Sequence, residues 1–261
     1  MLRKQAHYLF MTCRFALVIF LFNTAYGQIE QPHRYEVEQK SSDLNFNIIS
    51  LKGEGLALIR ETEKFDDGKK IWEIVHLDSA LNSSWSDKLK LNGQLNMIGY
   101  EYLRGQLFLL FRSSEAGLHN ITLLHFSLLT HEYVEYEIKH QFDLRLTHFS
   151  VAGATAVFGG YAIKEPTVIL YSLKDKQVKV VPGFLLRDTE LLDLRVNHNQ
   201  NTFNVLMAER GSKEEKKIFV RTYDETGALL VEDEMIMEKN KVPLSGMTSE
   251  LVKDEMIVVG T

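Results

Sequence analysis

Cysteine is nearly absent from this chain, since Cys13 is the only one among 261 residues. It precedes the apolar run of residues 15–22, whereas a cysteine that receives a lipid anchor would follow such a run. The chain after residue 27 therefore cannot form an intramolecular disulfide. A chain of about 230 residues is large enough to be stable through its hydrophobic core alone.

Proline and helical patterns are scarce as well. The chain has four prolines, and none falls inside a segment that we predict as a strand. Apolar residues do not recur at a helical spacing over any long stretch. No long apolar segment follows residue 27, so we expect no stable membrane insertion once the amino terminus is removed.

The amino terminus has the pattern of a secretory signal peptide. Arg3, Lys4 and Arg14 supply positive charge, and residues 15–22 are apolar. Ala25 and Gly27 then place small residues three positions and one position before Gln28. We expect an exported protein (periplasmic, cell-surface or extracellular) whose mature chain starts at Gln28, with an uncleaved membrane anchor as the alternative.

The mature chain is acidic. Residues 1–27 hold three of the 30 basic residues and no acidic one, which leaves 27 basic and 35 acidic residues, a net charge of −8. Binding to nucleic acid needs a concentrated basic face. We therefore expect no nucleic-acid partner.

Short apolar runs bounded by Ser and Gly recur along the chain, as is typical of strands. By subtraction, the starts of five such runs are 51, 49, 47 and 53 residues apart. A second marker, an apolar or aromatic residue followed by Asp or Ser, keeps the same step. The runs start at Leu56, Leu107, Ala156, Phe203 and Met256, and the second marker occurs at Leu77-Asp78, Phe126-Ser127, Tyr171-Ser172 and Tyr223-Asp224.

Each repeat has room for four strands, and Asp67-Gly68 is a strong hairpin signal between two of them. A fifth repeat offers a strand at 256–259, which we expect to pair with one around residues 248–251. The other expected strands are 46–51, 55–61, 71–78 and 87–91; 97–102, 106–112, 121–127 and 133–138; 149–152, 155–161, 167–173 and 178–181; and 193–197, 203–208, 218–224 and 232–237.

A four-stranded unit that repeats every 40–50 residues or so resembles the blade of a β-propeller, of the kind common in secreted bacterial proteins. The resemblance covers residues 44–261 and is architectural, because WD, kelch and Asp-box signatures are absent. It implies an all-β, β-propeller-like fold of about four four-stranded blades and a partial fifth. A β-sandwich would not predict this period, and a membrane barrel needs strict alternation instead of continuous apolar runs.

The fifth repeat stops at Thr261, after its second strand. We expect either a fragment of a longer propeller or an open, incomplete ring. The expected organisation is a signal peptide at 1–27, a linker or closing strand at 28–43 and a repeat domain at 44–261.

No motif of catalysis, metal binding or cofactor binding accompanies the repeats. Five of the nine histidines lie between His119 and His148, at spacings that match no zinc pattern. His125 alternates with apolar residues, so we interpret it as a hydrogen-bonded core histidine. Nucleophile elbows, phosphate-binding loops and calcium loops are absent. We therefore predict no catalytic residue, no metal and no cofactor, and we expect Trp72 and Trp85 to pack between blades, with a carbohydrate platform as the alternative.

The propeller resemblance also implies where a ligand binds. Loops after the second strand of each blade and loops between blades share one face around a central channel, where ligands of propellers usually bind. Solvated loop residues are the competing interpretation of this set. The candidate binding residues in these loops are Asp66, Asp67, Glu115, His119, Arg145, His148, Arg187 and Asp188.

Three functions remain open at this stage. The absence of catalytic motifs favours an exported, non-catalytic module that binds a protein or a glycan through its loop face. A propeller enzyme, a hydrolase or lyase with its active centre at the channel, is the second, because such enzymes scatter their residues over several blades. A structural repeat fragment of a larger surface protein is the third.

Overall fold

The computed structural model describes residues 33–38, 44–92, 95–113, 120–140, 142–184, 188–210, 216–237, 241, 243–248 and 256–260. The expected signal peptide, residues 1–27, lies outside these. Within the described ranges, every regular element is a strand apart from one 3-10 turn, η2 (Lys52–Glu54). The strands form four antiparallel sheets of four strands and one hairpin. The chain is therefore all-β, as the sequence predicts.

The first two sheets follow the predicted order of strands closely. In each, neighbours in sequence are neighbours in the sheet. The first sheet contains β1 (Asn47–Ser50), β2 (Leu56–Asp66), β3 (Lys69–Leu77) and β4 (Ser83–Leu91), and the second contains β5 (Leu95–Leu103), β6 (Gln106–Ser113), β7 (Asn120–Ser127) and β8 (Tyr133–Lys139).

The remaining sheets repeat this plan, which ends in the hairpin. The third sheet contains β9 (Leu144–Ala152), β10 (Thr155–Ala162), β11 (Glu165–Ser172) and β12 (Val178–Val180), the fourth contains β13 (Thr189–Asn197), β14 (Thr202–Glu209), β15 (Lys216–Asp224) and β16 (Leu229–Met237), and the hairpin contains β17 (Pro243–Thr248) and β18 (Met256–Gly260).

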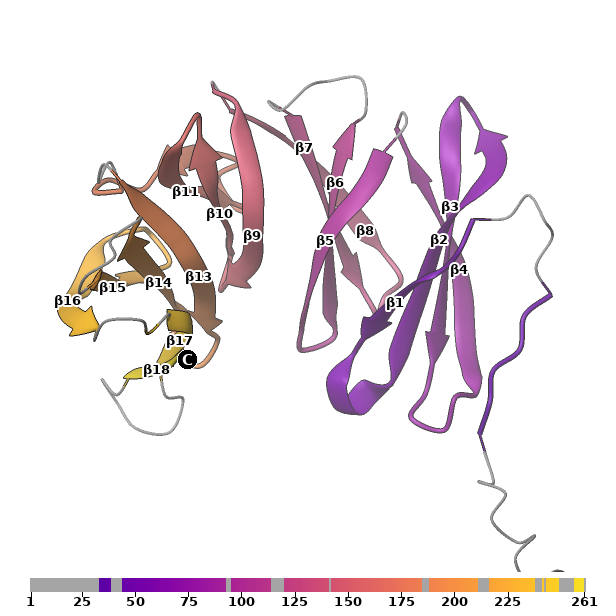
Figure 1. Cartoon of the computed structure of the whole chain (residues 1–261). Helices are drawn as coiled ribbons and strands as arrows, with labels where there is room; N and C mark the ends of the chain where they lie inside the picture. The colour runs from indigo at the N-terminus through magenta and orange to yellow at the C-terminus, as the bar shows by residue number, and fades with distance from the viewer. Residues whose placement is uncertain are drawn as a thin grey trace, which may run out of the picture.

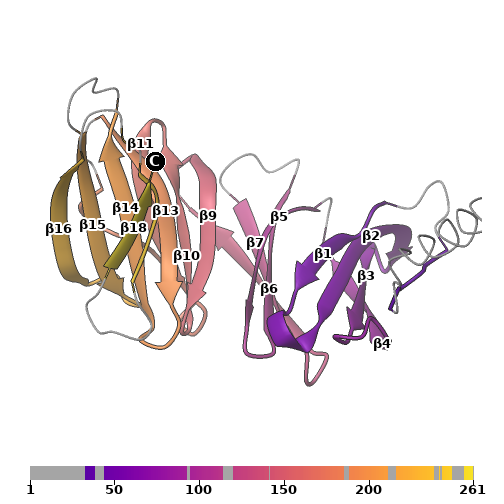
Figure 2. The ribbon, with the colours of Figure 1, turned by 60° about the horizontal axis from the view of Figure 1, so that its bottom comes forward.

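The four sheets are blades of a β-propeller-like arc. The first strands of successive blades lie beside one another, β5 next to β9, β9 next to β13 and β13 next to β17. These strands are therefore the innermost ones. Figures 1 and 2 show the blades following one another in chain order, with β1–β4 and β17–β18 in opposite halves of the molecule. The described strands form an open arc.

The core lies between blades, as it must when each sheet has two faces to bury. Trp72 of blade 1 is 3% exposed and meets the Phe111 ring of blade 2 edge-on at 5.1 Å between ring centroids. Blades 2 and 3 share a cluster around Phe108 and Phe158, and blades 3 and 4 share one around Val157 and Phe203. The predicted packing of tryptophan between blades is confirmed, since Trp85 also packs against this first interface.

The predicted inner runs of the four blades are buried apart from Leu56, which is half-buried, whereas Ile257 and Val259 of the last run are exposed. Each run lies on the second strand of its blade, and in blades 2 and 3 both faces of that strand contact a neighbouring blade. In β6, residues Leu107–Phe111 are all at most 4% exposed. Continuous apolar runs therefore arise because these strands have no solvent face.

Turn chemistry explains why the hairpins close where they do. Asp67 and Gly68 have φ of 51° and 77° between β2 and β3, as the predicted turn requires. Arg104 and Gly105 have φ of 47° and 75° between β5 and β6. Both pairs keep their flanking strands in antiparallel register.

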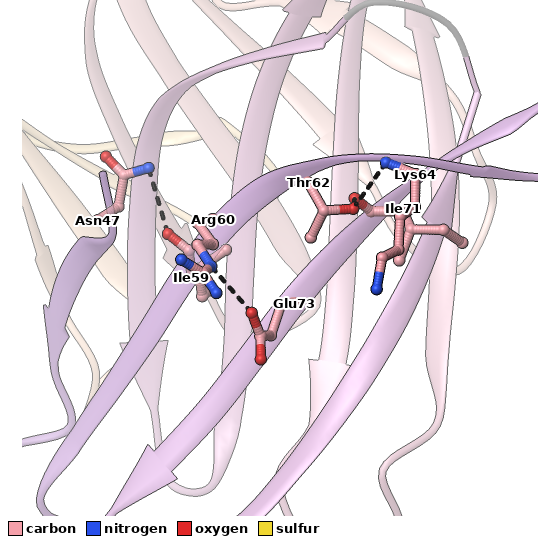
Figure 3. Close-up of polar contacts among 7 residues, drawn as sticks. All are labelled: Asn47, Ile59, Arg60, Thr62, Lys64, Ile71 and Glu73. Carbon is pink, nitrogen blue, oxygen red and sulfur yellow. Dashed lines mark hydrogen bonds and ion pairs between the residues drawn. The ribbon is translucent and has the colours of Figure 1, made fainter. Parts of the chain in front are cut away.

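The second strand of blade 1 carries an irregularity that side chains hold in place. The register of β2 against β3 shifts between Glu61 and Phe65. Thr62 Oγ1 donates a hydrogen bond to the carbonyl of Ile71 (2.8 Å) and accepts one from the Lys64 amide (3.2 Å), as Figure 3 shows. The hydroxyl thus replaces ladder bonds that the shift removes.

Two terminal segments differ from the strands expected from the sequence. The partner of β18 is not centred on residues 248–251; it runs from Pro243 to Thr248, and Thr248 pairs with Met256. Residues 249–251 lie outside the described residues. Residues 33–38 are not a strand, and Tyr35 packs against Leu58 and Val75 on the free face of blade 1.

Candidate functional site

Each inner strand after β1 carries one extra residue at the same place. On β5, Met97 pairs with Phe111 and Gly99 pairs with Leu110, so one residue between them has no partner. Such bulges redirect side chains and are common beside functional sites. The extra residues are Ile98, Thr147, Leu192 and Leu244 on β5, β9, β13 and β17.

Glycine makes one of these bulges possible. Opposite Thr147, the register of β10 shifts between Gly159 and Gly160. A Cβ atom on Gly160 would lie 2.2 Å from the carbonyl oxygen of Arg145, which no side chain could tolerate. The glycine at position 160 therefore allows a close approach of the two backbones.

The residue after each bulge occupies an equivalent position on the inner strands. From blade 2 to the hairpin these residues are Gly99, His148, Asp193 and Ser245. Asp193 is 7% exposed, and its Oδ2 accepts hydrogen bonds from Ser245 Oγ and from Arg195 Nε (3.1 Å). Equivalent residues of blade 4 and the hairpin thus contact one another; we call the row of inner strands on which they lie the channel wall.

The surroundings of His148, which include Asp193, favour its neutral form. Burial lowers the pKa of His148, and the negative charge of Asp193 opposes this effect only in part. His148 Nδ1 lies 2.8 Å from Thr147 Oγ1, and the same hydroxyl can donate to the carbonyl of Gly159 at 3.3 Å. A neutral imidazole in this position can accept or donate a hydrogen bond to a polar ligand.

A second row of polar residues lies two positions further along the strands. Ser150 Oγ of blade 3 donates to Glu101 Oε2 of blade 2 at 2.9 Å. Glu101 Oε1 lies 3.8 Å from His198 Nε2, which belongs to the turn after β13 of blade 4. One carboxylate thus joins three blades at the channel.

Two adjoining cavities lie along this wall. The first, of about 300 Å³, lies between β5, β6 and β9, and the second, of about 500 Å³, lies between β5, β9 and β13. Thr147, His148 and Phe149 line both. The larger cavity has the charged residues Glu101, Asp193 and Arg195, whereas the smaller has Arg112 and the ring of Tyr100. Their combined size is that of a small-molecule site.

The hydrogen-bond partners of the serine hydroxyls indicate what this wall can do chemically. Both serine hydroxyls of the wall, Ser150 and Ser245, donate to carboxylates and not to an imidazole. Among the described residues, no three His, Cys, Asp or Glu side chains are grouped to hold a metal ion. The wall offers fixed hydrogen-bond acceptors and donors, which suits the recognition of a polar ligand.

The loop residues predicted from sequence lie at several places. His148 lines both cavities. Asp66 pairs with Lys90 and Asp67 forms the β2–β3 turn, both in blade 1. Arg145 stacks over the Tyr161 ring (5.0 Å from Cζ to the ring centroid), and the Asp188 carbonyl accepts the Arg210 amide.

The structure brings only His148 of this set into the channel wall. Glu115, His119 and Arg187 lie outside the described residues. The interpretation of His125 as a core histidine is confirmed, because its Nε2 lies 2.8 Å from Gln106 Oε1 and its ring stacks on Phe108.

Sequence reasoning missed the wall residues because they lie inside strands. It searched loops, whereas Glu101, Ser150, Asp193 and Arg195 belong to the inner strands. One signal was present: Gly99, His148, Asp193 and Ser245 are 49, 45 and 52 residues apart by subtraction, close to the repeat period. Only the bulges, which no composition reveals, set their common position.

No protein family matches the sequence, and no curated protein matches it either. Among solved structures, the β-propeller domain of the Trilobed protease from Pyrococcus furiosus is similar at a TM-score of 0.46 and 11% identity, over 77% of this chain and 60% of that one. A nidogen/laminin complex is similar at 0.39 and 12%, over 70% and 61%. A mutant of the Synechocystis apocarotenoid oxygenase is similar at 0.44 and 7%, over 75% and 49%. The chain thus spans about half to three fifths of these structures, and no activity is carried over from them.

Proposed function

We propose that this chain is an exported, non-catalytic module that binds a glycan in the channel of its propeller-like arc. Export rests on the charged, apolar and small-residue pattern of residues 1–27. The observation that supports binding is the pair of adjoining cavities at the inner strands, which both carry charged residues and share Thr147, His148 and Phe149.

A saccharide suits both cavities. Its hydroxyls can donate hydrogen bonds to the carboxylates of Glu101 and Asp193, because an ionised carboxylate only accepts hydrogen bonds. Its apolar ring face can lie against Tyr100, whose side chain is among the exposed large hydrophobic ones at 45%. The bonds from Ser150 and Ser245 hold the two carboxylates in place before any ligand arrives, which lowers the entropic cost of binding.

Titration calorimetry on the full-length protein with a panel of neutral and acidic oligosaccharides tests this proposal. At least one saccharide should bind saturably, and Glu101→Ala together with Asp193→Ala should abolish the heat. Asp66→Asn is the matched control, because this carboxylate lies in blade 1 and pairs with Lys90. The proposal fails if no saccharide binds, or if only proteins bind and the double variant binds them as well as the parent.

A glycoside hydrolase is the second candidate, because Glu101 and Asp193 line one cavity and such enzymes use two carboxyl groups. Binding alone is favoured because both carboxylates already accept hydrogen bonds from serine hydroxyls, Glu101 from Ser150 and Asp193 from Ser245, and are fixed by them. Chromatography of the bound saccharide after incubation distinguishes the two. Cleavage that Asp193→Asn abolishes would establish the enzyme.

A further inference from the structure

The smaller cavity contains a cation that no carboxylate of the described residues pairs with. Arg112, at the carboxyl-terminal end of β6, lines this cavity beside Leu110 and His148. Its Nε atom is shielded from solvent and has no hydrogen-bond partner, and its Nη2 donates to the carbonyl of Leu144 at 3.2 Å. No carboxylate of the described residues pairs with this guanidinium.

A partly buried charge without a partner is costly, and two other arginines of the strands have a carboxylate partner. Arg60 donates to Glu73 at 2.9 Å (Figure 3), and Arg221 donates to Glu232 at 2.7 Å. Burial lowers the pKa of Arg112, with no opposing negative charge, yet a guanidinium keeps its proton in a protein. A part-buried charge without a partner destabilises the fold unless something else compensates it.

The space beside Arg112 is open because Gly99 has no side chain. A Cβ atom there would lie 3.6 Å from Cδ1 of Phe149 and 3.9 Å from Cβ of Leu110, an ordinary contact distance. At the equivalent position of the next blade stands His148, and after it Asp193. The cavity of about 300 Å³ therefore exists where the polar row leaves one place empty.

The charges of the two cavities differ. Arg112 lines the smaller one, whereas Glu101, Asp193 and Arg195 line the larger, where Arg195 already donates to Asp193. A ligand that spans both needs an anionic group at one end and hydrogen-bond donors at the other. A saccharide with one carboxylate and several hydroxyls meets both requirements. An acidic peptide would bring further carboxylates toward Glu101 and Asp193, which repel them.

We infer that the cavity between β5 and β9 binds the carboxylate of an acidic saccharide, such as a uronic acid unit, through the guanidinium of Arg112. This inference rests on the proposed glycan function and adds the class of the sugar. Guanidinium–carboxylate hydrogen bonds are among the strongest that proteins form, and the planar guanidinium gives them direction. The hydroxyl of Thr147 and the ring of Tyr100 line the same cavity and complete the site.

Titration calorimetry on the full-length protein tests the inference with matched pairs of ligands. Oligosaccharides that contain galacturonate, glucuronate or sialate are compared with their methyl esters, which keep the shape and lose the charge. We expect at least one acid to bind more than about tenfold tighter than its ester, which corresponds to ~1.4 kcal/mol. The preference should shrink at high salt.

Two variants test the residues. Arg112→Met should remove the preference for the acid while the ester still binds as it does to the parent. Gly99→Ala should weaken binding of both, because the added methyl group occupies the cavity without disturbing Phe149. Arg112→Lys should retain only part of the preference, since an ammonium group lacks the planar fork.

The outcomes separate this inference from the proposed function. Equal binding of acids and esters to the parent overturns the carboxylate site and leaves glycan binding intact. Binding of acidic peptides such as oligoglutamate, without any saccharide, overturns both. A preference for acids that Arg112→Met leaves unchanged in a folded protein also overturns the assignment, and Arg112→Lys, which should keep only part of the preference, provides the same test if the Met variant does not fold.

Discussion

Two interfaces between blades each contain an arginine, buried in one and partly buried in the other, and the partners of these two arginines differ. Between blades 3 and 4, Arg221 is 8% exposed and all three of its nitrogens donate: Nε and Nη2 to Glu232 (2.9 and 2.7 Å), and Nη1 to the carbonyl of Gly183. Between blades 2 and 3, Arg112 has one such bond, to Leu144. The fold compensates the first charge fully and leaves the second to an outside partner.

We infer from this difference that Arg221 stabilises the fold, whereas Arg112 binds a ligand. A buried polar group without a partner is rare in native proteins and calls for an explanation. Arg221 joins β15 to β16 and to the connection that follows β12, so its contribution is to stability. Arg112 lies beside a cavity, so its cost is compensated when a ligand binds. The changes described next test this contrast, and we expect their effects on stability to decrease in the order given.

Deletion of residues 243–261 should have the largest effect, because it removes the cover from the outer face of blade 4. Val258 packs against the cluster of Leu206, Ile218 and Val220, and Ser245 donates to Asp193. Each large side chain returned to water costs about 1.5–3 kcal/mol. We expect aggregation or a marked fall in melting temperature by differential scanning calorimetry.

An unchanged melting temperature in a monomeric deletion variant would contradict this expectation. It would mean that β17 and β18 do not contribute to the fourth blade. Ser245→Ala is the milder companion variant, since it removes only the hydrogen bond to Asp193.

Arg221→Met should destabilise the chain by about 2 kcal/mol. It leaves Glu232 without its partner and the Gly183 carbonyl without a donor. The loss stays below the 3–5 kcal/mol or so of a fully buried pair because the Glu232 side chain is 45% exposed. Urea titration at constant pH measures the change, and a loss no larger than that of Arg112→Met would remove the contrast between the two interfaces.

Acid should loosen blades 2 and 3, which carry His125 and His148, before it loosens blade 4. Burial lowers the pKa of both His125 and His148 below the ordinary 6.5. The unfolded chain therefore takes up these protons first as the pH falls, so their contribution to stability is complete above about pH 6.5 and decreases below it. Hydrogen exchange measured at pH 5.5 and at pH 7.5 should show that the amides of β7 and β9 lose more protection at the lower pH than the amides of β14.

His125→Gln sharpens this test. Glutamine keeps a hydrogen-bond partner for Gln106 but cannot titrate, so the stability of the variant should depend less on pH between about 5 and 7. If parent and variant have the same pH profile, His125 does not supply the effect.

Arg112→Met should have the smallest effect on stability, within about 1 kcal/mol of the parent, and that effect should be stabilising. Removal of an uncompensated buried charge relieves its desolvation cost, and the methionine side chain fills the same space. Thermal denaturation without ligand measures it. A loss as large as that of Arg221→Met would show that Arg112 is structural.

Much of the fold follows from local rules that act within the sequence. Apolar runs such as residues 107–111 cannot be solvated on either face, so they predict inner strands, and Asp67-Gly68 closes a hairpin because both residues adopt positive φ. The first strand of the last hairpin escaped these rules. Residues 243–248 form a short, partly polar segment, so no apolar run marks them as a strand. Their pairing with β18 appears only in the structure.

The sequence by itself determined the all-β class, the period of the blades, the absence of any possible disulfide after residue 27 and the acidic charge. These properties depend on composition and spacing alone. Only the tertiary structure decided which polar residues meet. Glu101, Ser150 and His198 come from three different blades, and the contacts between them depend on how the blades curve around the channel. The lack of a partner for Arg112 is likewise a property of three-dimensional packing, because acidic residues are plentiful in the chain and none of those described reaches it.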